Sequence, residues 1–584
     1  MAIESKTTTS GALTMTRRDA VTGAAVLGAG VAAALGTGAA SNALAAEAQA
    51  GAADGEVSAN PAWLGDAPAI ADADIADTWD TDLLIVGAGN SGMLAAARAA
   101  DAGLDFRIVE AAAGVCMSRD FYAAVNTEEC AAAGCEVDVD KLRGEIARYA
   151  SGKCDSRVVN LWVNESNAMH EYVKGIMAQY GFVPTCSADT GVETSGTDYY
   201  NPPIQHSYSS TEEGEYSSYA RNDVLKDYIE KKGYAVDFNT ELVELVMAED
   251  GAGVAGAIVY NSDDKAYIRV NAKNVILASG GYAANPEMMM ALQPLTCKCI
   301  NTARYHFFNT GQGLKAALWA GAVKDVEPAV VIFDRGAVAP GTDSGYVQDE
   351  SGEWELPGTL GTQQNEYNPG TQPFLKVNRD GERFANESCP YNDILFAAAN
   401  QKGGTYCQVY DANFQEDWQR FHTLGCSSVT RMIPEVMAAA IEGNVEAGII
   451  MKADTLDELA DKLGFEGAAK ETFLATCDRY NELFDQQHDD DFGKAAYRLS
   501  ELRTAPFYGV WMGGLLLTTL DGVKINPKAQ ALDASGEVVP GLYAVGDVSG
   551  NFFANNYPSL LPGLCCGRGL TEAIKAVDTI VAEG

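Results

Sequence analysis

The sequence predicts an α/β protein built around a parallel sheet, because three short apolar segments each end in small residues. The first occupies 82–86 and runs directly into a glycine-rich turn and a helix, while the others occupy 274–281 and 541–547. An apolar run of four to eight residues bounded by turn residues is typical of a strand buried on both faces. With 584 residues, the chain is long enough for two or three domains.

The composition is that of an acidic globular protein, with 47% hydrophobic residues and a formal net charge of −39. This charge argues against binding to nucleic acid and to anionic membrane surfaces, since both draw on clustered lysine and arginine. The acidity indicates either simple solubility or docking to a basic electron-transfer partner.

The N-terminus has the order of an export signal. The twin arginines Arg17 and Arg18 precede an Ala/Gly/Val-rich stretch at 20–40, and 43–45 offers small residues for cleavage. We therefore expect a twin-arginine signal peptide at 1–45, a disordered linker at 46–77, and a mature chain at the periplasmic or extracytoplasmic face of the membrane. A membrane anchor at 20–40 is the alternative. No other run reaches the ~18 apolar residues of a membrane span, so no integral segment is expected in the mature chain.

Thirteen cysteines are scattered along the chain, which is an odd number for a disulfide framework. No Cys-x-x-Cys or Cys-x-x-Cys-His occurs, so the usual spacings of zinc sites, thioredoxin-type sites and c-type haem are absent. The sequence therefore predicts no metal site. An iron–sulfur cluster built from scattered cysteines stays open.

The most specific motif is a dinucleotide-binding fingerprint. The strand at 82–86 is followed by Gly87, Gly89 and Gly92 in G-x-G-x-x-G spacing, a helix follows, and Glu110 closes the next strand at 106–109. Strand, turn, helix and a terminal acid form the structural context that the motif requires. An ordinary strand–helix–strand unit with packing glycines is the alternative.

Each fingerprint residue has a physical role. Gly87 permits the tight turn, Gly89 lets the backbone approach a pyrophosphate, and Gly92 allows the helix to pack closely on the strand. Glu110 can accept the hydroxyls of an adenosine ribose. The helix N-terminus offers unpaired N–H groups to the phosphates, and the predicted cradle includes the two residues between the second and third glycines, Asn90 and Ser91.

The two later strands indicate which dinucleotide binds. Asp547, at the end of 541–547, is placed to bind a ribityl hydroxyl of a flavin. Together with the fingerprint, these segments resemble the FAD-binding subfamily that contains fumarate reductase and succinate dehydrogenase flavoproteins, urocanate reductase, cardiac glycoside reductases and 3-ketosteroid dehydrogenases. The resemblance covers nearly the whole mature chain and implies FAD as the cofactor. It adds a further set of cofactor-binding residues: Ala278, Ser279, Gly280, Gly546, Gly563 and Leu564.

The resemblance also implies the domain organisation. A Rossmann-like, glutathione-reductase-like FAD-binding domain would span 78–328 and 516–584, and an α+β capping domain at 329–515 would be inserted between its halves. In the family, the active site lies where the two domains meet.

Three segments match the family's substrate-binding segments. Residues 378–387 match its N-R-x-G-x-R-F-x-N-E pattern, and four positions later Tyr391 stands where fumarate reductases carry a catalytic arginine. Tyr557 stands at a second arginine position, and 518–522 lacks the family's substrate-binding histidine. Ketosteroid dehydrogenases carry tyrosines in such segments, so the resemblance implies that Tyr391 and Tyr557 are catalytic. Arg119 is the third candidate catalytic residue, and it would lie near the isoalloxazine or the pyrophosphate.

Tyrosines in place of arginines predict a neutral substrate, because a buried carboxylate without a cationic partner is costly. We expect an exported reductase that adds hydride from flavin N5 to the activated C=C of an enone, unsaturated lactone or plant phenolic. Tyr391 would supply the proton and Tyr557 would polarise a carbonyl. An external donor, a cytochrome or a flavoprotein, would provide electrons. The alternatives are a 3-ketosteroid-type dehydrogenase and a non-catalytic flavin electron carrier.

Overall fold

The computed structural model describes residues 60–116, 119–134, 136–187, 199–210, 221–304, 307–359 and 367–584. Residues 60–584 form one compact unit. The predicted signal peptide and the first part of the predicted linker lie outside the described residues. Within the described part, no helix combines the length and the apolar character needed to cross a membrane.

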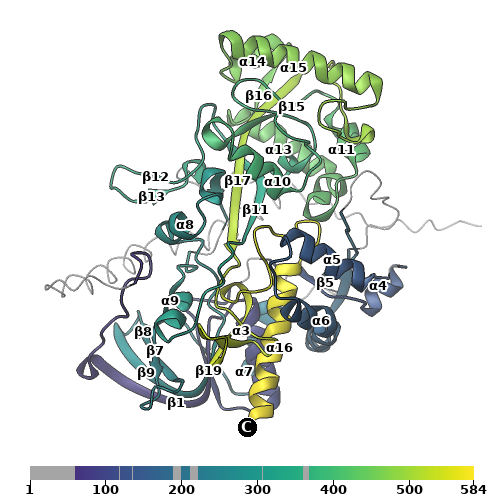
Figure 1. Cartoon of the computed structure of the whole chain (residues 1–584). Coiled ribbons are helices and arrows are strands. Elements are labelled where there is room, and N and C mark those ends of the chain that lie inside the picture. Colours follow the sequence, from purple (N-terminus) through teal and green to yellow (C-terminus); the bar gives the residue numbers. More distant parts are fainter. Residues whose placement is uncertain are drawn as a thin grey trace, which may run out of the picture. The chain divides into compact units, whose positions relative to one another are not determined.

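An eight-stranded sheet contains the fingerprint (Figure 1, lower part). Its core is parallel: β1 (Ile75–Val86) lies between β2 (Phe106–Val109) and β9 (Ala266–Leu277), with β6 and β19 outside them. The apolar run from Leu83 to Val86 is fully or almost fully buried, as its composition predicts. The other strands are β6 (Val236–Asp237), β7 (Thr240–Met247), β8 (Val254–Asn261), β18 (Gln530–Leu532) and β19 (Val538–Ala544).

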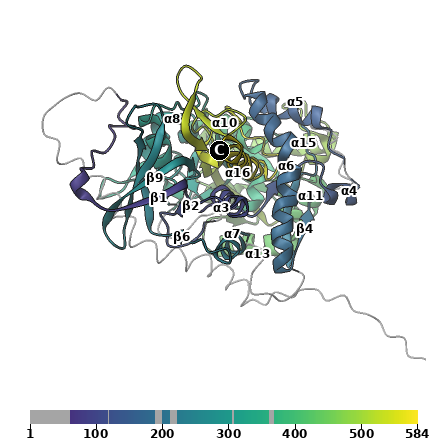
Figure 2. The ribbon, with the colours of Figure 1, turned by 90° about the horizontal axis from the view of Figure 1, so that it is seen from below.

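Two helices support the carboxyl end of β1. Helix α3 (Asn90–Ala102) follows the glycine turn and packs against α16 (Leu564–Glu583), and Figure 2 shows the two beside the sheet. Alanines fill the buried face of α3 and allow this close approach. The helix ends at Gly103, whose φ of 70° gives the left-handed cap that glycine adopts readily.

The linker prediction is wrong for its last residues. Strand β1 begins at Ile75, where Ile75 pairs with Tyr267 and Asp77 with Ile268 of β9. Most side chains from 75 to 80 are exposed. Backbone pairing extends the strand here, and only two of these six side chains, Ile75 and Trp79, are half-buried, so the apolar signal is weak.

A second, six-stranded sheet belongs to the predicted cap region (Figure 1, upper part). Its central strand is β17 (Phe507–Thr519), which pairs with four other strands. One of these, β10 (Ile300–Ala303), comes from the segment assigned to the FAD-binding domain. The remaining strands are β11 (Val330–Val338), β14 (Leu375–Val377), β15 (Tyr406–Tyr410) and β16 (Met451–Ala453).

Helices around this sheet make the cap region a mixture of α and β structure. They are α10 (Tyr391–Ala398), α11 (Phe414–Phe421), α12 (Val429–Met432), α13 (Pro434–Glu446), α14 (Leu456–Lys462) and α15 (Gly467–Gln486). A hairpin of β12 (Val347–Gln348) and β13 (Trp354–Glu355) lies at its side, and α8 (Pro286–Leu292) and α9 (Gln312–Trp319) precede it in the chain.

A small third sheet and three helices fill the region between β2 and α7 (Arg221–Glu230) in the chain. In this sheet β5 (Gln205–Ser210) lies between β3 (Tyr122–Ala123) and β4 (Phe182–Cys186). The helices are α4 (Glu128–Ala132), α5 (Val139–Tyr149) and α6 (Ser156–Met177).

The segment 378–387 is anchored by a buried ionic cluster. Arg383 donates to both oxygens of Glu387 at 2.9 Å and to both oxygens of Asp489 at 2.9 and 3.1 Å. Burial raises the pKa of Glu387, but the charges of Lys494 and Arg383 outweigh it and leave that pKa below its usual value. Hydrogen bonds from Arg383 likewise outweigh burial at Asp489 and lower its pKa.

Replacing Arg383 by methionine is expected to lower the free energy of unfolding at pH 7 by about 3–5 kcal/mol, because two carboxylates lose their guanidinium partner in the interior. Both carboxylates have depressed pKa values, so this difference is fully present above their unfolded pKa of about 4 and shrinks as the pH falls below it. Urea unfolding at several pH values measures it. Arg479→Met, which breaks an exposed pair with Asp491, is the control and is expected to cost about 0–1 kcal/mol. Equal losses in both variants would contradict the argument.

Candidate active site

A cavity of about 1070 Å³ opens at the carboxyl ends of the parallel strands. The residues that follow β1, β2, β9 and β19 line one part of it, and residues of β11 and β17 line another. Ligands of open α/β sheets bind at such strand ends. One cavity therefore joins the predicted cofactor cradle to the second sheet.

The three fingerprint glycines differ in what a side chain would meet. A Cβ on Gly92 would lie 1.8 Å from the carbonyl oxygen of Gly87, and a Cβ on Gly87 would lie 2.5 Å from the carbonyl oxygen of Ala278. A Cβ on Gly89 would meet no protein atom within 4 Å. Gly87 and Gly92 therefore allow close packing, whereas Gly89 faces the space in which a cofactor would lie.

No side chain caps α3, whose N-cap is Gly89. The first backbone N–H groups of a helix have no partner within the helix, and here they face a cavity. Such an N-terminus attracts phosphate through these N–H groups and through the helix dipole. This arrangement suits a dinucleotide pyrophosphate.

Glu110 fixes the turn and also lines the cavity. Its Oε2 accepts from the backbone N–H of Ala88 at 2.6 Å and its Oε1 from that of Ala112 at 2.9 Å. Burial raises the pKa of this carboxyl. The carboxylate therefore ties the glycine turn to the end of β2, at the place where a ribose would lie.

Asn90 is the centre of a polar group at the start of α3. Its amide nitrogen donates to the carbonyl oxygen of Arg119 at 3.1 Å, and its amide oxygen accepts from Arg221 at 2.8 Å and from Asn222 at 3.2 Å. These bonds hold the segment around Arg119 against the cavity wall.

Two polar groups that follow β9 and β19 suit a flavin. The buried hydroxyl of Ser279 has no hydrogen-bond partner among the described residues. Asp547 accepts from Thr518 at 2.8 Å and from the thiol of Cys565 at 3.0 Å, and it also lines the cavity. An unsatisfied hydroxyl and a carboxylate can both bind the hydroxyls and ring atoms of FAD, so the residues present fit this cofactor.

Most of the predicted cofactor residues line this cavity. Gly92 and Leu564 do not: Gly92 packs on Gly87, and Leu564 is buried in the first turn of α16. The predicted residues that line it are Gly87, Gly89, Asn90, Ser91, Glu110, Ala278, Ser279, Gly280, Gly546, Asp547 and Gly563.

The predicted catalytic residues are placed differently from one another. Arg119 and Tyr557 line the cavity, and the Tyr557 oxygen accepts from the backbone N–H of Cys565 at 3.2 Å. Tyr391 is buried and is not among the lining residues. Its ring packs edge-on against Phe333 with centroids 5.4 Å apart, and Phe333 does line the cavity.

Sequence reasoning missed most of the arginines of the site. Besides Arg119, the cavity is lined by Arg304, Arg335 and Arg431. The guanidinium of Arg335 lies 4.6 Å from the ring centre of Phe333, and that of Arg119 lies 5.9 Å from it. The cavity therefore holds cations that the sequence did not predict, in addition to Tyr557, and the catalytic roles of Tyr391 and Tyr557 stay predictions. These arginines come from segments that match no motif, so only the fold brings them together.

Comparison with known proteins agrees with this geometry. The family model of the FAD binding domain matches residues 82–559. The chain belongs to this family. It is an FAD-dependent oxidoreductase, and the predicted resemblance, fold class and cofactor are confirmed.

Several relatives share most of its length. A vinyl phenol reductase from Lactiplantibacillus plantarum is 26% identical over 501 residues, which are 83% of this chain and 93% of that protein. A probable fumarate reductase from Shewanella frigidimarina is 24% identical over 82% of this chain and 71% of that protein. The solved 3-ketosteroid Δ1-dehydrogenase from Sterolibacterium denitrificans, in complex with 1,4-androstadiene-3,17-dione, has a TM-score of 0.64 at 16% identity and covers 86% of this chain and all of that chain. This last likeness concerns the fold alone.

Proposed function

We propose that this family member reduces an activated C=C bond of a small organic molecule. The observation that carries the proposal is that one continuous cavity joins the FAD cradle to Phe333, Arg335 and Tyr557. FAD, when bound, supplies the hydride. Relatives named as a vinyl phenol reductase and a fumarate reductase support reduction of such a bond.

Phe333 and its two guanidinium neighbours indicate the substrate class. The ring offers an apolar face to a planar conjugated group, and Arg335, whose exposed fraction is 3%, offers a desolvated cation beside it. A guanidinium binds a carboxylate through two parallel hydrogen bonds and also polarises a carbonyl. We infer an α,β-unsaturated substrate that carries a carboxylate or a strongly polarised carbonyl. A neutral enone, lactone or phenolic is the second candidate, favoured by the uncharged Tyr557 in the wall.

Tyr557 is the proposed proton donor. Its oxygen accepts the N–H of Cys565 at the start of α16, and the residue lines the cavity, so the hydroxyl lies where a substrate would bind. A phenol placed there can give a proton to a substrate carbon or oxygen during the reaction. Tyr391, which lies behind Phe333, stays a prediction as the donor and would require the wall to move before it met substrate.

The remaining expectations complete the proposal. We infer export by the twin-arginine route from the N-terminal pattern of Arg17 and Arg18. We also infer that an external cytochrome or flavoprotein supplies the electrons, because the sequence has no Cys-x-x-Cys-His motif for a haem of its own. Catalysis in the oxidative direction, as in a ketosteroid-type dehydrogenase, is the alternative that uses the same cavity.

Anaerobic reoxidation of the dithionite-reduced protein tests the substrate class. We expect absorbance near 450 nm to return faster with an unsaturated carboxylate, such as caffeate, urocanate or fumarate, than with a 3-keto-4-ene steroid or a cardenolide. The reason is the buried guanidinium of Arg335 beside Phe333.

Arg335→Gln sharpens this test. It should lower the rate with the best carboxylate by about 10²-fold or more, and lower the rates with neutral carbonyl compounds less, because a carbonyl carries no full charge for the guanidinium to pair. Arg498→Gln is the matched control, because Arg498 is buried in the cap region but does not line the cavity. Fast reoxidation by a neutral compound alone would establish the second candidate. Reduction of the oxidised protein by a saturated ketosteroid, without reoxidation by any alkene, would establish the dehydrogenase.

A further inference from the structure

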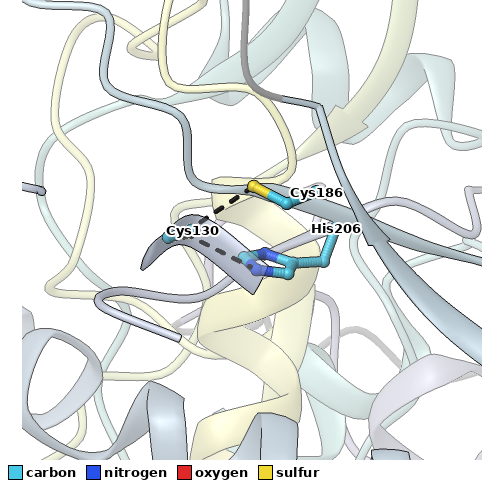
Figure 3. Close-up of side chains that lie close together, drawn as sticks. All are labelled: Cys130, Cys186 and His206. Atoms are coloured by element: carbon cyan, nitrogen blue, oxygen red, sulfur yellow. Dashed lines mark hydrogen bonds between the residues drawn. The ribbon is translucent and has the colours of Figure 1, made fainter. Parts of the chain in front are cut away.

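Two cysteines and a histidine meet at the edge of the small third sheet, in a position that neither the cofactor cradle nor the proposed reduction uses (Figure 3). Cys186 ends β4, and His206 is its direct cross-strand partner on β5. Cys130 comes from α4 and is fully buried, as is His206. Three elements far apart in the sequence therefore converge on one point.

The ligand atoms of the three residues all lie within 4.8 Å of one another, and two of the three distances match those between zinc ligands. The two sulfur atoms are 3.7 Å apart, and Cys130 Sγ is 3.8 Å from His206 Nε2. Tetrahedral zinc with Zn–S of about 2.3 Å and Zn–N of about 2.0 Å separates two sulfurs by about 3.8 Å and a sulfur and a nitrogen by about 3.5 Å. A disulfide would require sulfurs about 2.0 Å apart.

The histidine is also held in the right orientation. His206 Nδ1 lies 2.8 Å from the carbonyl oxygen of Ile204, which can only accept, so Nδ1 carries the proton and Nε2 presents a lone pair to the cluster. Such a bond on the second nitrogen is usual for a metal-binding histidine. The hydroxyl of Thr127 lies 2.8 Å from Nε2, and the metal would replace it as the partner of this nitrogen.

A second group of potential ligands shares His206 but suits a metal less well. His170 lies 2.8 Å from Glu129 through Nε2 and 2.8 Å from the hydroxyl of Tyr122 through Nδ1, so both ring nitrogens are engaged by strong partners. Lys174 also pairs with Glu129 at 2.9 Å and already neutralises its charge.

We propose that Cys130, Cys186 and His206 bind a zinc ion. The two cysteines would bind as thiolates and His206 through Nε2. The carbonyl oxygen of Pro203, 3.0 and 3.5 Å from the two sulfurs, or a water would complete the tetrahedron. Cys186 and Pro203 line the active-site cavity. Zinc would thus fasten to α4 the cavity wall formed by Asn201, Pro202, Pro203 and Gln205.

Metal analysis of the purified holoprotein tests the site. After expression with added zinc and dialysis, we expect about one zinc per chain. Elemental mass spectrometry measures the zinc, and the FAD content is determined on the same sample. Cys130→Ser, Cys186→Ser and His206→Ala should each lower the zinc content by about tenfold or more. Cys407→Ser and Cys477→Ser are matched controls, because both replace buried cysteines remote from the cluster, and they should retain the metal.

Thiol alkylation of the wild-type protein keeps the test valid if a ligand variant fails to fold. Zinc should protect Cys130 and Cys186 from iodoacetamide, and a zinc chelator should remove this protection while FAD stays bound. A wild-type protein with less than about a tenth of a zinc per chain, iron in place of zinc, or a native Cys130–Cys186 disulfide would each overturn the proposal. These outcomes leave the proposed reduction untouched, because that reaction is read independently from the flavin.

Discussion

Gly92→Ala is expected to yield a chain that purifies without FAD and unfolds at a lower temperature. A Cβ at this position would lie 1.8 Å from the carbonyl oxygen of Gly87, a separation that no side chain tolerates. The start of α3 must then move away from β1, and the N–H groups that would face a pyrophosphate move with it. Flavin absorbance per chain and thermal unfolding measure the two effects.

Two other glycines serve as comparisons. Gly89→Ala meets no protein atom, so we expect a folded chain whose FAD affinity is reduced by the methyl group in the cradle. Gly144→Ala, within α5, also meets no atom and should leave FAD unchanged while stabilising the chain by about 0.5–1 kcal/mol. Full FAD occupancy in Gly92→Ala would mean that the fingerprint is only a packing motif.

Tyr557→Phe is expected to lower the rate of alkene-dependent reoxidation by about 10²-fold or more with FAD still bound. The substitution removes only the hydroxyl and keeps the ring that packs against Phe553 with centroids 5.4 Å apart. The binding of substrate to the reduced protein should change little, so the loss should appear in kcat rather than in KM. Rapid mixing under anaerobic conditions gives both values.

Tyr391→Phe is the matched variant, since its ring would remain packed on Phe333. If Tyr557 donates the proton, Tyr391→Phe should keep its rate within about threefold of wild type. The reverse pattern, with Tyr391→Phe slow and Tyr557→Phe unaffected, would return the donor role to Tyr391 and require that the wall opens during turnover.

The sequence predicted the cofactor side of the site better than the substrate side, for a physical reason. The cradle is local: Gly87, Gly89 and Gly92 belong to one turn, and Glu110 follows the adjacent strand. A motif can therefore describe it. Arg335 contacts the same cavity from a strand more than two hundred residues away, and no local pattern distinguishes it from an ordinary arginine.

The cysteine–histidine cluster was missed for a related reason. Cys186 and His206 are neighbours only because β4 and β5 pair antiparallel, and Cys130 joins them from a separate helix. Spacing rules for zinc sites assume ligands on one short loop or helix. Here the pairing of β4 with β5 brings Cys186 and His206 together, and the sequence did not predict that pairing.

The paired strands β11 and β17 have a consequence for how this chain can change. Val330 and Thr519 are direct partners, so the long segment between them starts and ends at adjacent points of one sheet. The entropic cost of closing a loop grows only slowly with its length, and here a hydrogen-bonded ladder already holds both ends. We therefore expect the part of the chain that lies between β11 and β17 to tolerate changes of length while the two strands keep their spacing beside the cofactor cradle.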